Sequence, residues 1–261
     1  MDLREYRAKQ KDFIRHPYES ARIQAINILL SKYIKKETLT VLDVGTGDGF
    51  ALERICSNFK KAQGLGFDTF LTKQETDRLN SDFKDNNIDV RLTSLKQEAE
   101  DFARNTPPDL ICLMDILEHI KDDKDFFGGI IKDYGIKKPL YLFITVPAYN
   151  WLFSLHDKNL GHYRRYCLKD ISKVVICSGA EIKDCGYMFF SGFLVRCLGK
   201  LLEKCFHFNK TIGNVSKWNH GALLTNLLRS ALMADFYFGR FVKHLGIILP
   251  GLSIYLIASK K

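Results

Sequence analysis

Residues 41–50 of this chain read Val-Leu-Asp-Val-Gly-Thr-Gly-Asp-Gly-Phe. An apolar, β-branched run gives way to three alternating glycines and then to the helix-favouring residues 51–55, which predicts a strand, a tight turn and a helix. Glycine adopts positive φ readily and lets a ligand approach the backbone, while free amides at a helix start attract a carboxylate or a phosphate. The stretch therefore indicates a nucleotide-like ligand, although a plain tight turn is an open alternative.

The spacing of the glycines and the end of the next strand narrow the choice of ligand class. The dinucleotide fingerprint is G-x-G-x-x-G, whereas the three glycines here alternate and follow an acid, Asp43. Residues 62–67 form a second predicted strand that ends at Asp68. Because ligands of doubly wound sheets bind at the carboxyl ends of strands, the Asp68 carboxylate can accept two hydrogen bonds from a ribose diol. Its alternative role is to cap the next helix.

A fourth predicted strand, residues 109–114, is nearly all apolar and runs into Asp115-Ile116-Leu117-Glu118-His119. This motif and the glycine stretch together resemble class I S-adenosylmethionine (SAM)-dependent methyltransferases. The resemblance implies that the loop wraps the methionine half of the cofactor and that Asp43 holds the loop and its ligand. The cofactor-binding residues predicted in this way are Asp43, Gly45, Thr46, Gly47, Gly49, Asp68, Met114 and Asp115.

One position departs from the family pattern. Many members carry an acid and an apolar residue after the third strand, where they hold the adenine. This chain has Ser94-Leu95 after its predicted strand 89–93. We predict that Leu95 packs on the adenine ring and that Ser94 is a weak polar contact.

The resemblance implies an α/β fold with a Rossmann-like, seven-stranded, mostly parallel sheet in the order 3-2-1-4-5-7-6 and helices on both faces. The later strands are expected at residues 140–146, 181–188 and 252–258, the last of them antiparallel. A length of 261 residues suits one domain with one core. Within that single domain, residues 1–38 are predicted as an N-terminal helical segment and residues 189–249 as a helical insertion or cap before the last strand.

Residues 147–166 follow the fifth strand and are rich in aromatic, histidine and arginine side chains. They resemble a branch of these methyltransferases found in polysaccharide and lipid-linked glycan assembly. We predict that Tyr149, Trp151, Arg164 and Arg165 bind the acceptor substrate. The two arginines could grip a phosphate or carboxylate, or they could form a salt-bridged loop pair.

Methyl transfer from a sulfonium needs mainly the correct positioning of the nucleophile, and a hydroxyl acceptor also benefits from a general base. Histidine has a suitable pKa, so His119, His156 and His162 are the catalytic candidates, each with a structural role as its alternative. His156, Asp157 and His162 have a weak metal-binding spacing, and we expect no metal.

Composition limits the cellular setting. Seven cysteines without a C-x-x-C pair favour a reducing cytoplasm over a disulfide framework. The charged N-terminus argues against a signal peptide, and no apolar run reaches the ~20 residues of a membrane span. All of the net charge of +9 comes from residues 151–261, where 16 Lys and Arg face 6 Asp and Glu. We expect no nucleic-acid partner, because no known binding module accompanies this charge.

The predicted function is transfer of a methyl group from SAM to an oxygen of a saccharide or of a lipid-linked, amphiphilic small molecule. The alternatives are a quinone-type small-molecule methyltransferase and a non-catalytic SAM-binding scaffold at a membrane. The basic, aromatic insertion is compatible with a cover over an amphiphilic acceptor, with a face on anionic lipid at the inner membrane surface, or with an ordinary helical cap. The sequence leaves the oligomeric state open.

Overall fold

The computed structural model describes residues 7, 14–85, 89–134, 140–206, 218 and 220–260. Their strands form one sheet in the order β3-β2-β1-β4-β5-β7-β6, with β7 antiparallel to both of its neighbours and the other strands parallel. The strands are β1 Thr38–Val44, β2 Lys61–Phe67, β3 Val90–Thr93, β4 Leu110–Met114, β5 Leu140–Pro147, β6 Glu181–Met188 and β7 Ser253–Lys260. The predicted fold class and strand order are confirmed.

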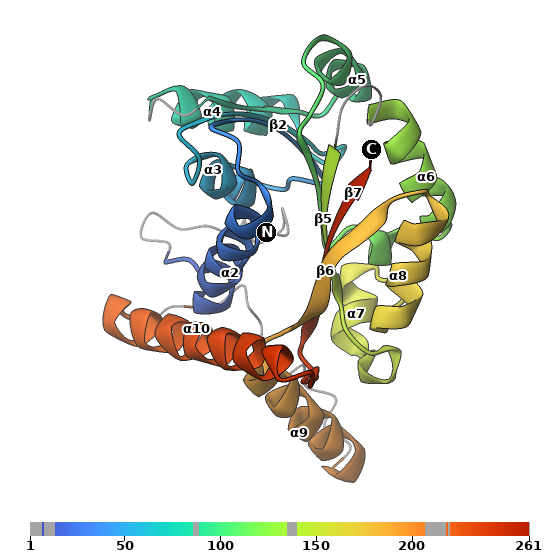
Figure 1. The fold of residues 1–261 in the computed structure, drawn as a ribbon. Coiled ribbons are helices and arrows are strands. Elements are labelled where there is room, and N and C mark those ends of the chain that lie inside the picture. Colours follow the sequence, from blue (N-terminus) through green and yellow to red (C-terminus); the bar gives the residue numbers. More distant parts are fainter. Residues whose placement is uncertain are drawn as a thin grey trace.

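Helices cover both faces of the sheet, and each face has its own apolar cluster. Helices α2, α3, α4 and α10 pack on one face, and α5, α6 and α8 pack on the other (Figure 1). Because β4 is buried on both faces, its sequence is apolar throughout, whereas the equally central β1 also contains the buried polar residues Thr40 and Asp43. The helices are α2 Pro17–Tyr33, α3 Phe50–Cys56, α4 Lys73–Asp85, α5 Lys96–Asn105, α6 Asp123–Tyr134, α7 Leu155–Leu160, α8 Leu168–Cys177, α9 Phe190–Phe206 and α10 Ala222–His244, with 3₁₀ turns η1 Leu117–His119 and η2 Asn150–Leu152.

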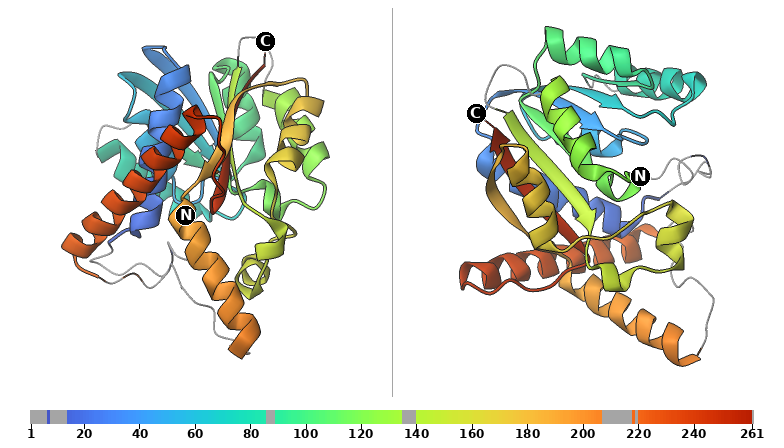
Figure 2. Two further views of the ribbon diagram at one scale, coloured as in Figure 1. Left: turned by 60° about the horizontal axis from the view of Figure 1, so that its bottom comes forward. Right: turned by 90° about the vertical axis from the view of Figure 1, so that its right-hand side faces the viewer.

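The carboxyl ends of the parallel strands meet at one edge of the sheet. In the right-hand view of Figure 2, β5 points toward α7 and α9, which lie beyond this edge. Three non-glycine residues with positive φ stand just after β4, β5 and β6, namely Asp115 (56°), Tyr149 (61°) and Phe189 (62°). Such backbone strain gathers at functional sites, so it marks this edge for closer description.

The insertion between β6 and β7 contains α9 and α10, as the sequence predicts. Its anchor is Asp184 of β6, which accepts a hydrogen bond from Arg240 at 2.8 Å and forms an ion pair with Lys243. Burial alone would raise the pKa of Asp184, but these two cations lower it to about 2. The proposed boundaries of the N-terminal segment and the cap stay predictions, and Lys210 and Lys217 of the insertion lie outside the described residues.

Large apolar side chains of α9 and α10 remain exposed. They include Leu223, which is 87% exposed, and a row along α10 that contains Leu227, Phe238 and Phe241. On α9 the exposed apolar residues are Leu194, Val195, Leu198, Leu201 and Leu202. Among the described helices, none combines the length and the apolar character that crossing a bilayer requires.

Candidate active site

The loop between β1 and α3 depends on glycine. Gly45, Gly47 and Gly49 have φ of 75°, 59° and 74°, in the left-handed region that side chains disfavour. A Cβ on Gly45 would also lie 1.9 Å from Cδ1 of Ile116. The amides of Gly45 and Thr46 donate to the carbonyl of Phe67 at 2.7 and 3.3 Å, which ties the loop to the end of β2.

Asp68 stands beside this loop at the end of β2. Its Oδ2 accepts a hydrogen bond from the Gly47 amide at 3.0 Å, and its Oδ1 accepts one from the Phe70 amide at 2.9 Å. A carboxylate has about four acceptor positions, so each oxygen retains capacity for a further donor such as a ribose hydroxyl. The structure thus brings Asp68 and the glycine loop together.

Asp43 lies beneath the same loop and is buried. Neither of its carboxylate oxygens has a hydrogen-bond partner among the described residues, and the same holds for the hydroxyl of buried Thr46. Burial raises the pKa of Asp43 to about 7. A buried polar group without a partner is uncommon in folded proteins and calls for an explanation, such as a ligand that would satisfy it.

The remaining residues predicted for the cofactor line the same edge. Ser94 is half-buried, whereas Leu95 is exposed at the end of β3, with its amide bonded to Oγ1 of Thr93 at 3.1 Å. Met114 at the end of β4 is half-buried. Their positions are compatible with an adenine contact, which stays a prediction.

Asp115 is the centre of a partly buried ionic network that crosses from the sheet to α2. Its carboxylate forms an ion pair with Arg22, and it accepts a hydrogen bond from Oγ1 of Thr145 at 3.1 Å. Arg22 also donates to Thr145 at 2.6 Å. Burial would lower the pKa of Arg22, but Asp115 raises it above its ordinary value. The sequence did not predict the pairing of Arg22 with Asp115, because the two residues are 93 positions apart.

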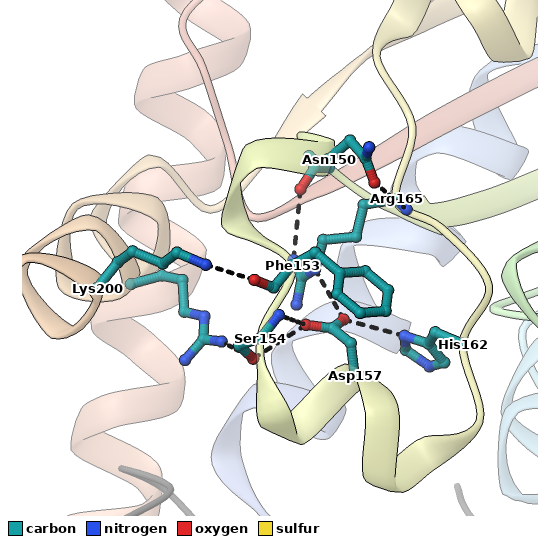
Figure 3. Close-up of polar contacts among 9 residues, drawn as sticks. Asn150, Phe153, Ser154, Asp157, His162, Arg165 and Lys200 are labelled. Carbon is teal, nitrogen blue, oxygen red and sulfur yellow. Dashed lines mark hydrogen bonds and ion pairs between the residues drawn. The ribbon is translucent and has the colours of Figure 1, made fainter. Parts of the chain in front are cut away.

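Asp157 organises the segment that follows β5, and Figure 3 shows its contacts. Its Oδ1 accepts from Arg165 at 2.7 Å and lies 3.0 Å from Nδ1 of His162, while its Oδ2 accepts from the amide and the hydroxyl of Ser154 at 2.9 and 3.0 Å. Burial alone would raise the pKa of Asp157, but His162 and Arg165 lower it below its ordinary value. The Ser154 hydroxyl also bonds to Arg196 of α9.

Two of the three histidine candidates lie together. The rings of His119 and His162 meet edge to face with centroids 4.6 Å apart, next to the buried carboxyl group of Glu118. Burial and then the Asp115 charge raise the pKa of Glu118 well above its ordinary value. His156 of α7 is half-buried, and its burial lowers its pKa.

Both arginines predicted to bind the acceptor have internal partners. Arg164 pairs with Asp123 at 3.2 Å and donates to the carbonyl of Lys121 at 2.5 Å. Arg165 is almost fully buried against Asp157, as described above. These contacts match the alternative of a salt-bridged pair, and a role in acceptor binding stays a prediction.

Aromatic side chains gather beside this network. Tyr149 stacks on Tyr187 of β6 with centroids 5.1 Å apart, and Phe193 of α9 contacts both Tyr149 and Trp151. Trp151 is 56% exposed and thus presents an apolar face at the carboxyl edge. The sequence predicted Tyr149 and Trp151 here but not Tyr187 or Phe193.

The residues at this edge fit SAM. Residues 45–49 form a loop in which a Cβ at position 45 has no space. Beside it, Asp43 offers buried oxygens that have no partner among the described residues, and Asp68 offers a carboxylate for a diol. When bound, SAM supplies an activated methyl group on its sulfonium. The acceptor-side residues would then position a nucleophile and exclude water.

Comparisons with known proteins give one family match and several similar folds. A family model described as a methyltransferase domain matches residues 14–220, whereas a search of curated proteins gave no match. The fold is similar to that of the cyclase SpnF, with a TM-score of 0.56 and 13% identity over 99% of this chain and 91% of that chain. It is also similar to phosphoethanolamine N-methyltransferase 2 of Haemonchus contortus in complex with phosphomonomethylethanolamine and S-adenosylhomocysteine, with a TM-score of 0.54 and 18% identity over 98% of this chain and 56% of that chain. At these identities the two structures establish the fold alone.

Proposed function

The chain belongs to the methyltransferase-domain family and is a class I, SAM-dependent methyltransferase, and from this premise we propose that it methylates an oxygen of an amphiphilic small molecule. Saccharides and lipid-linked glycans are the acceptor classes that we favour. The observation that carries the proposal is the aromatic cluster around Trp151, which lies at the carboxyl edge next to α9. Exposed aromatic faces bind sugar rings and acyl chains through their apolar area.

The proposed catalytic sequence needs few groups from the protein. The glycine loop and Asp68 bind and orient the cofactor, while the segment of residues 148–166 positions the acceptor. Bound SAM would supply the activated methyl group to a hydroxyl acceptor held by this segment, and the hydroxyl proton would pass to a base. His162 is our preferred base, because Asp157 holds its Nδ1 and leaves Nε2 available as the proton acceptor.

We further propose that the apolar rows of α9 and α10 rest on a membrane surface. Exposed apolar patches of this extent on a helix pair are uncommon in monomeric soluble proteins and typically mark contact sites. This arrangement would give the enzyme access to an acceptor whose acyl chain stays in the bilayer. The cytoplasmic location stays a prediction.

Methyl transfer to the proposed acceptor can be tested with methyl-labelled SAM. The protein is incubated with a polar-lipid extract and, separately, with a pool of water-soluble saccharides, and label is measured in the organic and aqueous phases. We expect label in the organic phase and a loss of at least tenfold for Trp151→Ala. Label confined to the aqueous pool would contradict a lipid-linked acceptor, and no transfer to either pool would contradict both acceptor classes.

Membrane contact can be tested by flotation with vesicles that contain phosphatidylglycerol. We expect the wild-type protein to float and the double variant Leu227→Glu, Phe241→Glu to stay in solution, because both side chains lie on the exposed apolar row of α10. Ile176→Glu is the matched control, since Ile176 is equally apolar and 58% exposed but lies on α8, on the other face of the sheet. Equal flotation of all three proteins would refute the proposed surface.

A further inference from the structure

We propose that Glu118, His119 and His162 form a binding site for a divalent transition-metal cation. One potential ligand atom from each residue lies within 4.8 Å of the other two. Two imidazole nitrogens and one carboxylate oxygen form a donor set typical of zinc, iron and related cations. The sequence did not predict this site, because the only set weighed for a metal was His156, Asp157 and His162.

The backbone brings the three residues together. Asp115, with its positive φ, turns the chain at the end of β4 into η1, which carries Glu118 and His119. The segment after α7 returns to η1, where the Tyr163 amide donates to the Glu118 carbonyl at 2.8 Å. The Tyr166 hydroxyl donates to the Leu117 carbonyl at 3.0 Å. These bonds hold His162 beside His119 even though the two lie far apart in the sequence.

Two of the three potential ligands are already prepared for a cation. The Asp157 carboxylate acts as a hydrogen-bond acceptor toward three other groups. We therefore assign the proton of His162 to Nδ1, which donates it to Asp157, so that Nε2 keeps its lone pair for a metal. A carboxylate that fixes a histidine in this way is common in metal sites. Glu118 is 1% exposed, and its Oε2 has no hydrogen-bond partner among the described residues.

The charges around the cluster favour a cation. Three carboxylates face it, those of Asp115, Glu118 and Asp157, against two guanidinium groups, those of Arg22 and Arg165. One guanidinium is paired with Asp115 and the other with Asp157, so Glu118 has no ion-pair partner among the described residues. A divalent cation would stabilise the ionised form of Glu118, which burial alone disfavours.

Three protein ligands leave at least one coordination position for another oxygen. If the proposed oxygen acceptor occupies it, the cation takes the Nε2 lone pair, so His162 no longer serves as the base. The cation would instead make the hydroxyl more acidic, so that its proton passes to solvent water as the oxygen–methyl bond forms and the sulfur–methyl bond breaks. This consequence rests on the proposed function, whereas cation binding does not.

Cobalt binding to the full-length protein without SAM tests the site, because Co²⁺ replaces Zn²⁺ and its visible bands report the ligands. The protein should carry no polyhistidine tag. We expect one Co²⁺ per chain, with visible bands and without the intense near-ultraviolet band of thiolate ligation. Glu118→Gln and His162→Gln should each weaken binding at least tenfold. His244→Gln should bind as the wild type does, since His244 is exposed at the end of α10.

Folding of each variant is checked by circular dichroism. If the substitutions of the buried residues prevent folding, the Co²⁺ affinity of His119→Gln tests the site, because His119 is exposed and its replacement leaves the core unchanged. Three outcomes would overturn the proposal, namely no saturable Co²⁺ binding by the wild type, a thiolate band, or unchanged affinity in the folded variants of the three ligands. A failure of methyl transfer would leave these outcomes unaffected.

Discussion

Two buried aspartates at the same edge of the sheet have opposite surroundings. Asp43, at the β1 side, has no hydrogen-bond partner among the described residues, and burial raises its pKa to about 7. Asp157, at the β5 side, is bonded to Ser154, His162 and Arg165, which lower its pKa below the ordinary value. Both carboxylates are buried, so the difference lies in their partners.

The contrast separates a carboxylate whose oxygens have no partner among the described residues from one whose oxygens are used within the protein. Around Asp43 the loop is made of glycines and backbone amides, and we predict that the Asp43 oxygens serve the cofactor. Around Asp157 the side chains satisfy one another and fix the shape of the acceptor side. Substitutions at the two positions should therefore act in opposite directions on stability.

The largest effect is expected for Asp157→Ala. It leaves the buried guanidinium of Arg165 without its carboxylate, which should lower the free energy of unfolding by about 3–5 kcal/mol. Urea denaturation measures this loss. Asp125→Ala is the control, because Asp125 is exposed on α6 and should change stability by no more than about 0.5 kcal/mol. Equal losses of free energy of unfolding in the two variants would show that Asp157 does not stabilise the fold.

Asp43→Asn should instead stabilise the cofactor-free protein at neutral pH. The folded state holds the Asp43 proton up to a pKa of about 7, against 3.8 for an unperturbed carboxyl, so wild-type stability falls as the pH rises from about 4 to about 7. The variant lacks this titration and should be more stable by about 4 kcal/mol at pH 8. Urea denaturation at pH 4, 6 and 8 tests this prediction. A wild-type free energy of unfolding that rises over this pH interval would contradict it.

Gly45→Ala should disrupt the glycine loop itself. A left-handed alanine costs about 1–2 kcal/mol, and its Cβ would collide with Ile116, so stability should fall by about 2 kcal/mol and affinity for S-adenosylhomocysteine by at least about tenfold. Calorimetric titration and thermal unfolding measure both. Gly128→Ala is the matched control, because Gly128 lies in helix α6 with open space around it and should be neutral or slightly stabilising.

Asp68→Asn is expected to have the smallest effect of this series, about 1.5 kcal/mol, confined to the cofactor. Asparagine keeps one acceptor for the Gly47 amide but loses the charge that strengthens hydrogen bonds from a ribose diol, so affinity for S-adenosylhomocysteine should fall about tenfold. Asp77→Asn on the exposed face of α4 should leave the affinity unchanged. An unaltered affinity in Asp68→Asn would show that Asp68 only holds the loop.

The two regions also differ in how well the sequence predicts them. Glycine spacing, apolar runs and acids at strand ends are local signals. They predicted the individual strands and the position of Asp68, and the family resemblance that they carry implied the sheet order. Ion pairs between distant segments leave no such signal. For this reason the sequence predicted neither the pairing of Arg22 with Asp115 nor the approach of His162 to Glu118, and it left the role of Arg165 open.

The left-handed residues after β4, β5 and β6 have a consequence for the evolution of this enzyme. Each makes the chain leave its strand abruptly, so the loop beyond it can change in length and composition without altering the register of the sheet. New acceptor specificities could thus arise by exchange of whole loops at these three corners, while the β1 and β2 ends keep the same cofactor.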